Sequence, residues 1–150
     1  MFKILKEAAP FLALDILNEL LLKIEHIPLG QYTHNTLKLI KKITITELDK
    51  PDNKVSKKFM FLLIFSQKSG KSQGLNLLWN AIMGINPEIV TEASDKFYKI
   101  IKHPRAHGRR LHFIEKCVEN LGESKSVAES LGLLSKIMGI RYRCMYVFMY

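Results

Sequence analysis

The fold is decided by residues 74–101, GLNLLWNAIMGINPEIVTEASDKFYKII, which predict a helix, an abrupt stop and a second helix. Gly84 interrupts the first helix. Asn86 and Pro87 are a typical start for the second, because Asn caps free N–H groups and Pro has none to satisfy. Each helix carries one apolar face: Leu75, Leu77, Leu78, Ala81 and Ile82, then Ile89, Val90, Ala93, Phe97, Ile100 and Ile101. Two amphipathic helices joined so closely lie antiparallel and need further neighbours, which predicts a helical hairpin of repeat type.

The remaining sequence predicts more helices of similar length. One begins at Pro10 and runs to Ile24; it is apolar on more than one face, so we expect it to be buried between neighbours. The next covers residues 36–48, capped by Thr33 or Asn35, although the β-branched run at 43–46 leaves a strand as the alternative. Further helices are expected at 59–65, from Arg109 or Arg110 to 121, and from 127 to 138. The expected apolar faces of the last two are Leu111, Phe113, Ile114, Cys117, Val118 and Leu121, then Val127, Ala128, Leu131, Leu134, Ile137 and Met138.

A weak internal repeat favours stacking of these hairpins. The apolar spacing of Leu37, Leu39, Ile40 and Ile43 recurs 38 residues later at Leu75 and again 36 residues later at Leu111. Such offsets lie near the period of about 40 residues of helical-pair repeats. We therefore expect an all-α fold of armadillo/HEAT-like stacked helical hairpins, an α-solenoid fragment, over residues 1–139. Residues 140–150, IRYRCMYVFMY, lack a period and are expected to form an irregular C-terminal tail.

Composition limits the class of protein. The chain is 47% hydrophobic, enough for a substantial core, and its net charge of +9 raises the question of an acidic partner. Two cysteines are too few for a disulfide framework and fit a reducing compartment. Glu7 and Asp15 interrupt the apolar N-terminal region, which argues against a signal peptide, and no apolar run is long enough for a membrane span. We expect a cytoplasmic protein, with the nucleus also open.

Sequence motifs for chemistry are weak. His103 and His107 are four residues apart, but Pro104 and Gly108 break the helix that would align them, and no third ligand completes a metal site. Cys117 lies on an apolar stripe, as a buried small hydrophobe would. We expect no metal, no cofactor and no catalytic residue.

The basic residues are the one candidate binding feature. Five of them crowd around the junction after the second helix of the hairpin and are the predicted patch for an acidic partner: Lys99, Lys102, Arg105, Arg109 and Arg110. A second basic group lies at residues 54–71. No zinc finger, helix-turn-helix spacing or aromatic platform specifies nucleic acid, so a nucleic-acid-binding module is the less favoured alternative.

LNLLWN at residues 75–80 and FIEKCVENL at residues 113–121 resemble a known family. They look like the helical-repeat region that precedes the catalytic domain in very large ubiquitin-specific proteases of the fat-facets type. The likeness covers about residues 32–139 and is best from residue 74 onward. That family uses a cysteine in a GNTCYxN-like box and a histidine in a Gly-His-Tyr box, and neither box occurs here. Cys117 and Cys144 do not match, so no catalytic residue is carried over.

The resemblance implies a non-catalytic scaffold segment of a large deubiquitinase, in the ubiquitin-removal pathway, that binds protein partners. A stand-alone armadillo/HEAT-type adaptor that binds an acidic peptide stays open as a second function. The oligomeric state does not follow from the residues.

Overall fold

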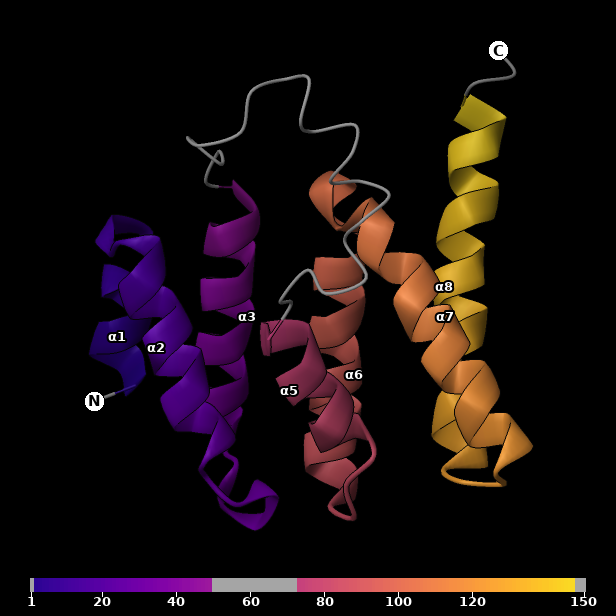
Figure 1. Cartoon of the computed structure of the whole chain (residues 1–150), viewed down its shortest axis with the longest axis horizontal. Coiled ribbons are helices and arrows are strands. Elements are labelled where there is room, and N and C mark those ends of the chain that lie inside the picture. The colour runs from indigo at the N-terminus through magenta and orange to yellow at the C-terminus, as the bar shows by residue number, and fades with distance from the viewer. Residues whose placement is uncertain (1, 50–72, 148–150) are drawn as a thin grey trace.

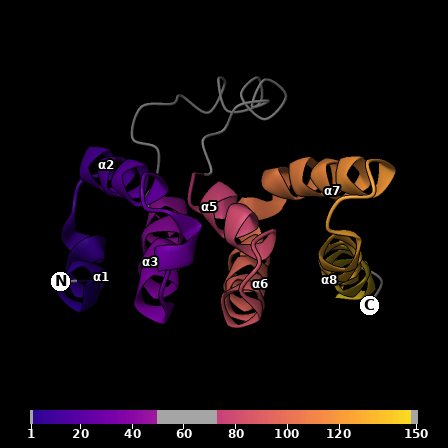
Figure 2. The same ribbon diagram turned by 90° about the horizontal axis from the view of Figure 1, so that it is seen from below.

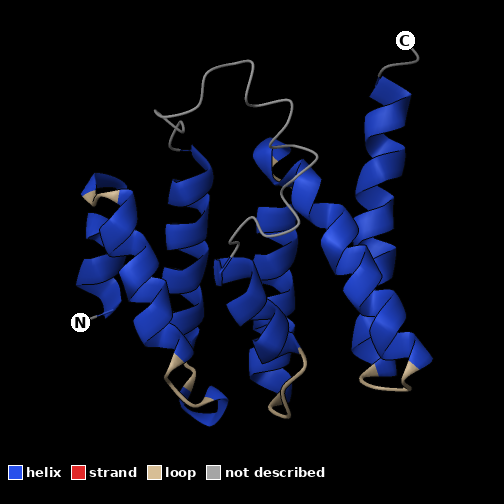
Figure 3. Ribbon diagram, in the orientation of Figure 1, coloured by secondary structure: helices blue, strands red, loops and turns tan. Residues whose placement is uncertain are grey.

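The computed structural model describes residues 2–49 and 73–147, and within these ranges the chain is all-helical without a strand (Figure 3). The α-helices are α1 (Phe2–Ala8), α2 (Leu14–Glu25), α3 (His34–Asp49), α5 (Gln73–Ile82), α6 (Pro87–Ile101), α7 (His107–Gly122) and α8 (Val127–Val147). Short 3-10 turns lie at Ala9–Phe11, Leu29–Gln31 and Pro104–Ala106. The predicted helix at 59–65 and the second basic group at 54–71 lie outside the described residues.

The helices form two layers. Helices α1, α3, α6 and α8 lie in one layer, and α2, α5 and α7 lie in the other (Figure 2). Three successive pairs, α2–α3, α5–α6 and α7–α8, are antiparallel hairpins, and α3, α6 and α8 all run in the same direction (Figure 1). Helix α6 contacts α3 on one side and α8 on the other, so the hairpin of residues 74–101 occupies the centre.

The predicted starts of α3 and α6 are both confirmed. Asn86 Oδ1 accepts hydrogen bonds from the backbone N–H groups of Glu88 at 3.1 Å and Ile89 at 3.5 Å, and Pro87 is the first residue of α6. Thr33 caps α3: its Oγ1 accepts from the N–H of Thr36 at 3.3 Å, and its own N–H donates to Thr36 Oγ1 at 3.3 Å. These reciprocal bonds satisfy donors that the first helical turn leaves free.

The β-branched run at 43–46 is helical, as preferred from the sequence. Thr44 Oγ1 donates to the carbonyl of Ile40 at 2.8 Å, and Thr46 Oγ1 donates to that of Lys42 at 2.9 Å. These bonds to the preceding turn satisfy the two hydroxyls within the helix while Ile43 is completely buried. The gain from burying α3 therefore outweighs the β-preference of these residues.

One hydrophobic core runs through the described helices. Leu78, Ile82 and Phe97 are fully buried in it, as expected, and Ile114 packs against it as a partly exposed residue. Phe113 is the fully buried residue of this part of α7. Its ring lies edge-on to Phe97 with centroids 4.9 Å apart. Such an aromatic contact joins the central hairpin to the next one.

The expected apolar faces of α7 and α8 are partly wrong. Leu111 and Val118 of α7 are 62% and 56% exposed, and Leu131 of α8 is 52% exposed. Phe113, Cys117 and Ile137 of the same expected faces are buried, and Ser130 and Leu133, which the prediction left out, are buried with them. These helices form the outer pair, with a neighbouring hairpin on one side only, so part of their apolar surface stays uncovered.

Both ends of the chain also depart from the sequence prediction. Pro10 lies in the turn Ala9–Phe11 rather than at the start of α2, and Phe11 is 89% exposed. The outward face of α2 leaves Ile16 and Leu22 half-exposed, so this helix is covered on one side. At the other end α8 continues to Val147. The prediction of an irregular tail is therefore wrong for residues 140–147. A single Gly139 costs a helix only about 1 kcal/mol and does not end it.

Candidate functional site

The predicted basic patch lies where α3 and α6 end and α7 begins. There the arginines bind the last carbonyls of neighbouring helices. Arg105 Nη1 donates to the carbonyls of Leu48 and Asp49, both at 2.8 Å, and so caps α3. Arg110 Nε donates to the carbonyl of Ile101 at 2.9 Å and caps α6. Helix C-termini leave unpaired carbonyls with partial negative charge, which a guanidinium satisfies well.

Arg109 is half-buried beside the carboxyl group of Glu47. Burial raises the pKa of Glu47 to about 7, although the positive charge of Arg109 acts in the opposite sense. Burial likewise lowers the pKa of Arg109, and Glu47 opposes that change. Two groups that are costly to bury are thus held together between α3 and α7.

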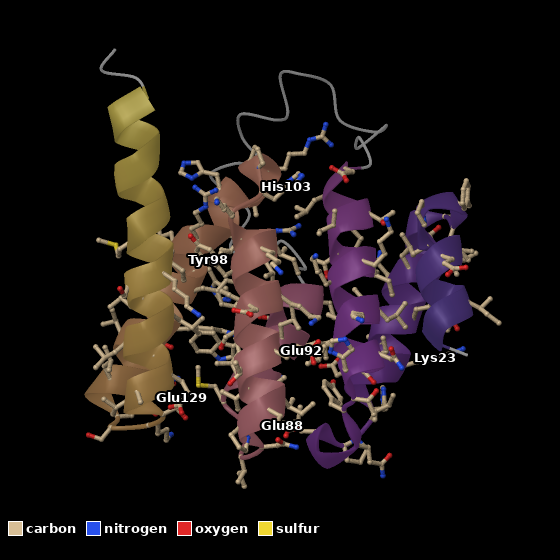
Figure 4. All side chains as sticks on the ribbon, turned by 180° about the vertical axis from the view of Figure 1, so that it is seen from behind. Lys23, Glu88, Glu92, Tyr98, His103 and Glu129 are labelled. Carbon is tan, nitrogen blue, oxygen red and sulfur yellow. The ribbon has the colours of Figure 1, made fainter. Side chains whose placement is uncertain are left out.

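The two lysines of the patch are exposed. Lys102 Nζ lies 5.9 Å from the ring centroid of Tyr98, and Lys99 lies one turn before it on α6. His103 is labelled in Figure 4, and its Nε2 atom lies 3.2 Å from Oδ1 of Asp49. The structure brings the five predicted residues to one end of the helices, but the donors of Arg105 and Arg110 are directed at backbone carbonyls.

A second feature, missed from the sequence, is an open groove of about 630 Å³ between α3 and α6. Most of its lining residues are ionisable, and the full set is His34, Pro87, Glu88, Thr91, Glu92, Asp95, Lys96 and Lys99. Figure 4 shows Glu88 and Glu92 along α6 on this side of the molecule. The next inter-helix space, between α6 and α8, holds a smaller hollow of about 300 Å³ that includes Glu129 and Lys136.

Glu92 is the centre of a small ionic network in the α3–α6 groove. Its Oε1 accepts from Lys96 Nζ one turn along α6, and it also contacts His34 Nδ1 at the start of α3. Burial opposes ionisation of Glu92, but the hydrogen bonds from Lys96 and His34 outweigh it and lower the pKa of the carboxyl group. The network joins α3 to α6 and fixes Lys96, which is only 8% exposed.

Further lysines lie near this network: Lys99 lines the same groove, and Lys41 of α3 feels the charges of Lys99 and Lys96. Burial lowers the pKa of Lys41, and repulsion from Lys99, Lys96 and Lys42 lowers it further. Within the described part of the chain, Lys41, Lys42 and Lys99 form no ion pair with a carboxylate. The packing of α3 on α6 brings Lys41 within range of the charges of Lys99 and Lys96, which the sequence alone does not show.

The groups considered for catalysis or metal binding are buried or dispersed. Cys117 is fully buried, and burial raises the pKa of its thiol to about 11. Trp79 is 6% exposed, and its ring centroid lies 5.6 Å from that of Phe113. Residues 2–49 and 73–147 contain no group of three His, Cys, Asp or Glu side chains arranged to hold a metal ion. Over the same residues, every helix is too short or too polar to cross a membrane.

The fold and the site therefore define a class of protein: an all-helical one with ionisable side chains along a groove between two helices. Comparison with protein-family models, with curated proteins and with solved structures finds no match to this chain.

Proposed function

We propose that this chain is a non-catalytic scaffold, built as stacked armadillo/HEAT-like helical hairpins, that binds protein partners. The observation that carries the proposal is the side-by-side order of the hairpins α2–α3, α5–α6 and α7–α8 in two layers (Figures 1 and 2). In a stack of this kind each hairpin contacts only its neighbours, and the long faces of the helices stay available to partners.

The distribution of exposed apolar residues supports this proposal. Ile4 and Phe11 are exposed at one end of the row, and Leu111, Val118 and Leu131 at the other. The described helices α3, α5 and α6 between them expose no large apolar side chain. In a stack, terminal hairpins need either a polar outer face or further neighbours. Uncovered apolar residues at both ends therefore favour a segment that packs against more helices.

Because the chain resembles fat-facets-type ubiquitin-specific proteases, we propose that this scaffold acts in the removal of ubiquitin. Its best-matching stretch, LNLLWN, contributes Leu75, Leu78 and Trp79 to the core, in keeping with a structural role. Sequencing the full transcript on both sides of the 150 codons tests this assignment. Further helical repeats followed by a cysteine box would support it, and flanking domains of another class would contradict it.

The non-catalytic part of the proposal has a direct test. A cysteine protease needs a thiolate activated by a base and donors for the oxyanion, whereas Cys117 is buried with a raised pKa. The purified chain is incubated with a fluorogenic ubiquitin conjugate and with a thiol-reactive ubiquitin trap. We expect neither turnover nor labelling. Labelling that disappears in Cys117→Ala or Cys144→Ala would overturn the proposal.

A stand-alone adaptor for an acidic peptide is the second candidate function. The observation that favours it is Lys99, which lines the α3–α6 groove and has no ion pair with a carboxylate among the described residues, together with the basic charge around it at the end of α6. Both candidates use the same kind of surface, and they differ in whether the chain works alone or inside a protease. Transcript sequencing separates them.

A further inference from the structure

We propose that the outer face of the α7–α8 hairpin binds the same face of a second copy of this chain, which makes a symmetric dimer. The centre of this face is Val118 and Leu121 near the end of α7 and Val127 and Leu131 at the start of α8. The inference goes beyond the proposed function, because it assigns one partner and the surface that this partner uses.

Both helices turn this face away from the rest of the described chain. The ammonium group of Lys116 in α7 lies 5.6 Å from the ring centroid of Trp79 on α5. Val118 follows two residues later, about 200° farther around the helix. In α8, Glu129 lines the hollow against α6, and Leu131 again lies about 200° from it. Helix α8 ends its layer, and no described helix lies beyond it (Figure 2).

The face gathers apolar side chains that elsewhere are scattered. Three of its four central residues are exposed, and the fourth, Leu121, is half-buried. Packing of α7 on α8 places the two pairs side by side, next to the turn that joins the helices. On α2, by contrast, the exposed residues Ile16 and Leu22 lie about 120° apart around the helix. Single exposed apolar residues are ordinary, whereas a contiguous group marks a binding surface.

The distribution of charge favours a second copy at this face. The chain carries a net charge of +9, which opposes contact between two copies wherever basic residues are exposed. Residues 111–139 contain three lysines and four glutamates, so this hairpin is close to neutral. On α8 one side of the face is bordered by Ala128, Gly132 and Ser135, which are exposed and uncharged. Two copies therefore meet here with little repulsion and without burying a charge.

The size of the face indicates a weak, reversible dimer. Each helix presents a strip about 20 Å long, and two packed helices are together about 20 Å wide. The face is thus about 400 Å² in projection, below the roughly 800 Å² per partner of a standard stable interface. We therefore expect a dissociation constant of about 1–100 µM.

Sedimentation velocity of the full chain, at concentrations from about 1 to 200 µM, tests the proposal. We expect a monomer that converts to a dimer, and to no larger species, as the concentration rises. Leu131→Glu places a carboxylate in the centre of the face and should weaken dimerisation at least about tenfold. The matched control is Leu22→Glu on α2, where Leu22 is exposed to a similar extent, and we expect it to leave the dissociation constant unchanged.

A charge-swap pair tests whether both copies use the same face. Val118→Glu/Leu131→Glu and Val118→Lys/Leu131→Lys should each be monomeric alone and should form a mixed dimer when combined, because opposite charges then meet across the interface. Circular dichroism melting of each dilute variant checks that the fold is intact. Val118→Ser, a milder change on α7, replaces any glutamate variant that unfolds. The monomeric variants also allow the opening of α7 and α8 to be followed without a partner copy.

Three results would contradict the proposal. A chain that stays monomeric over the whole range does not bind a second copy. Equal weakening by Leu131→Glu and Leu22→Glu would place the contact elsewhere. Oligomers that keep growing with concentration would require contact between unlike ends of the chain instead of a symmetric pair. The scaffold assignment does not depend on these results, because the ubiquitin substrate and trap test it separately.

Discussion

Gly74 of α5 lies directly against the side chain of Thr44 of α3: a Cβ atom at Gly74 would stand 1.8 Å from Thr44 Oγ1. The Thr44 hydroxyl is held there by its bond to the carbonyl of Ile40, and both residues are buried. Helix α5 therefore approaches α3 closely at a point where only glycine fits. This contact joins the first hairpin to the central one.

Gly74→Ala should reduce the free energy of unfolding by about 1–3 kcal/mol, because the added methyl group overpacks the α3–α5 contact. Equilibrium denaturation with urea measures the loss. Gly132→Ala in α8 is the matched control, since nothing lies within 4 Å of its Cβ position, and we expect a gain of about 0.5–1 kcal/mol. Thr44→Ala combined with Gly74→Ala should recover part of the loss; strictly additive effects would contradict the contact.

Leu78→Ala should cost about 2–5 kcal/mol of stability, because Leu78 is completely buried in the core of the central hairpin. Leu111→Ala removes the same atoms at a site that is 62% exposed, and we expect a change within about 0.5 kcal/mol. Chemical denaturation of the two variants side by side gives the comparison. Similar losses at both sites would mean that α7 buries Leu111.

Arg105→Ala should destabilise the protein by about 1–3 kcal/mol, because it leaves the carbonyls of Leu48 and Asp49 without their charged donor. Lys102→Ala removes a charge from the same junction without breaking a helix cap and should cost less than about 0.5 kcal/mol. Thermal melts of both variants provide the measurement. If Arg105→Ala is neutral, the arginine is available to a partner and the capping role is wrong.

Glu47 makes stability depend on pH. Its pKa is raised from the usual 4.5 to about 7 in the folded state, so between these values the folded protein binds more protons than the unfolded chain. Stability from this group is full below about pH 4.5 and is lost as the pH rises through 7. Allowing for solvent screening, we expect Glu47→Gln to be the more stable protein at pH 8 by about 1–2 kcal/mol and to show a flatter profile. A wild-type advantage at pH 8 would show that Arg109 stabilises the ionised form instead.

The sequence predicts those parts of the fold that depend on local patterns. Asn86 and Pro87 mark the start of α6, and the 3.6-residue period marks the buried faces of α5 and α6, because both act within one or two turns. The faces of α7 and α8 were wrong at Leu111 and Leu131. Their apolar pattern is weaker than that of the central helices, and whether an apolar side chain is buried also depends on how many neighbours a helix has.

The candidate site was less predictable than the fold. The crowding of basic residues after α6 was visible in the sequence, but the sequence does not show that Arg105 reaches the end of α3, a contact across 57 positions. Likewise Lys41 and Lys99 come together only because α3 packs on α6. Contacts between residues so far apart in the sequence can be identified only from the tertiary structure.

Native-state hydrogen exchange followed by NMR tests the stack of hairpins most directly. The central claim is that α5 and α6 are held by neighbours on both sides, whereas α7 and α8 have a neighbouring hairpin on one side only. Stacked hairpins open from their ends. We predict that amides of α3, α5 and α6 exchange most slowly and that α7 and α8 open together at a lower free energy. Exchange of all described helices in one cooperative step, or greatest protection in α7 and α8, would contradict the account.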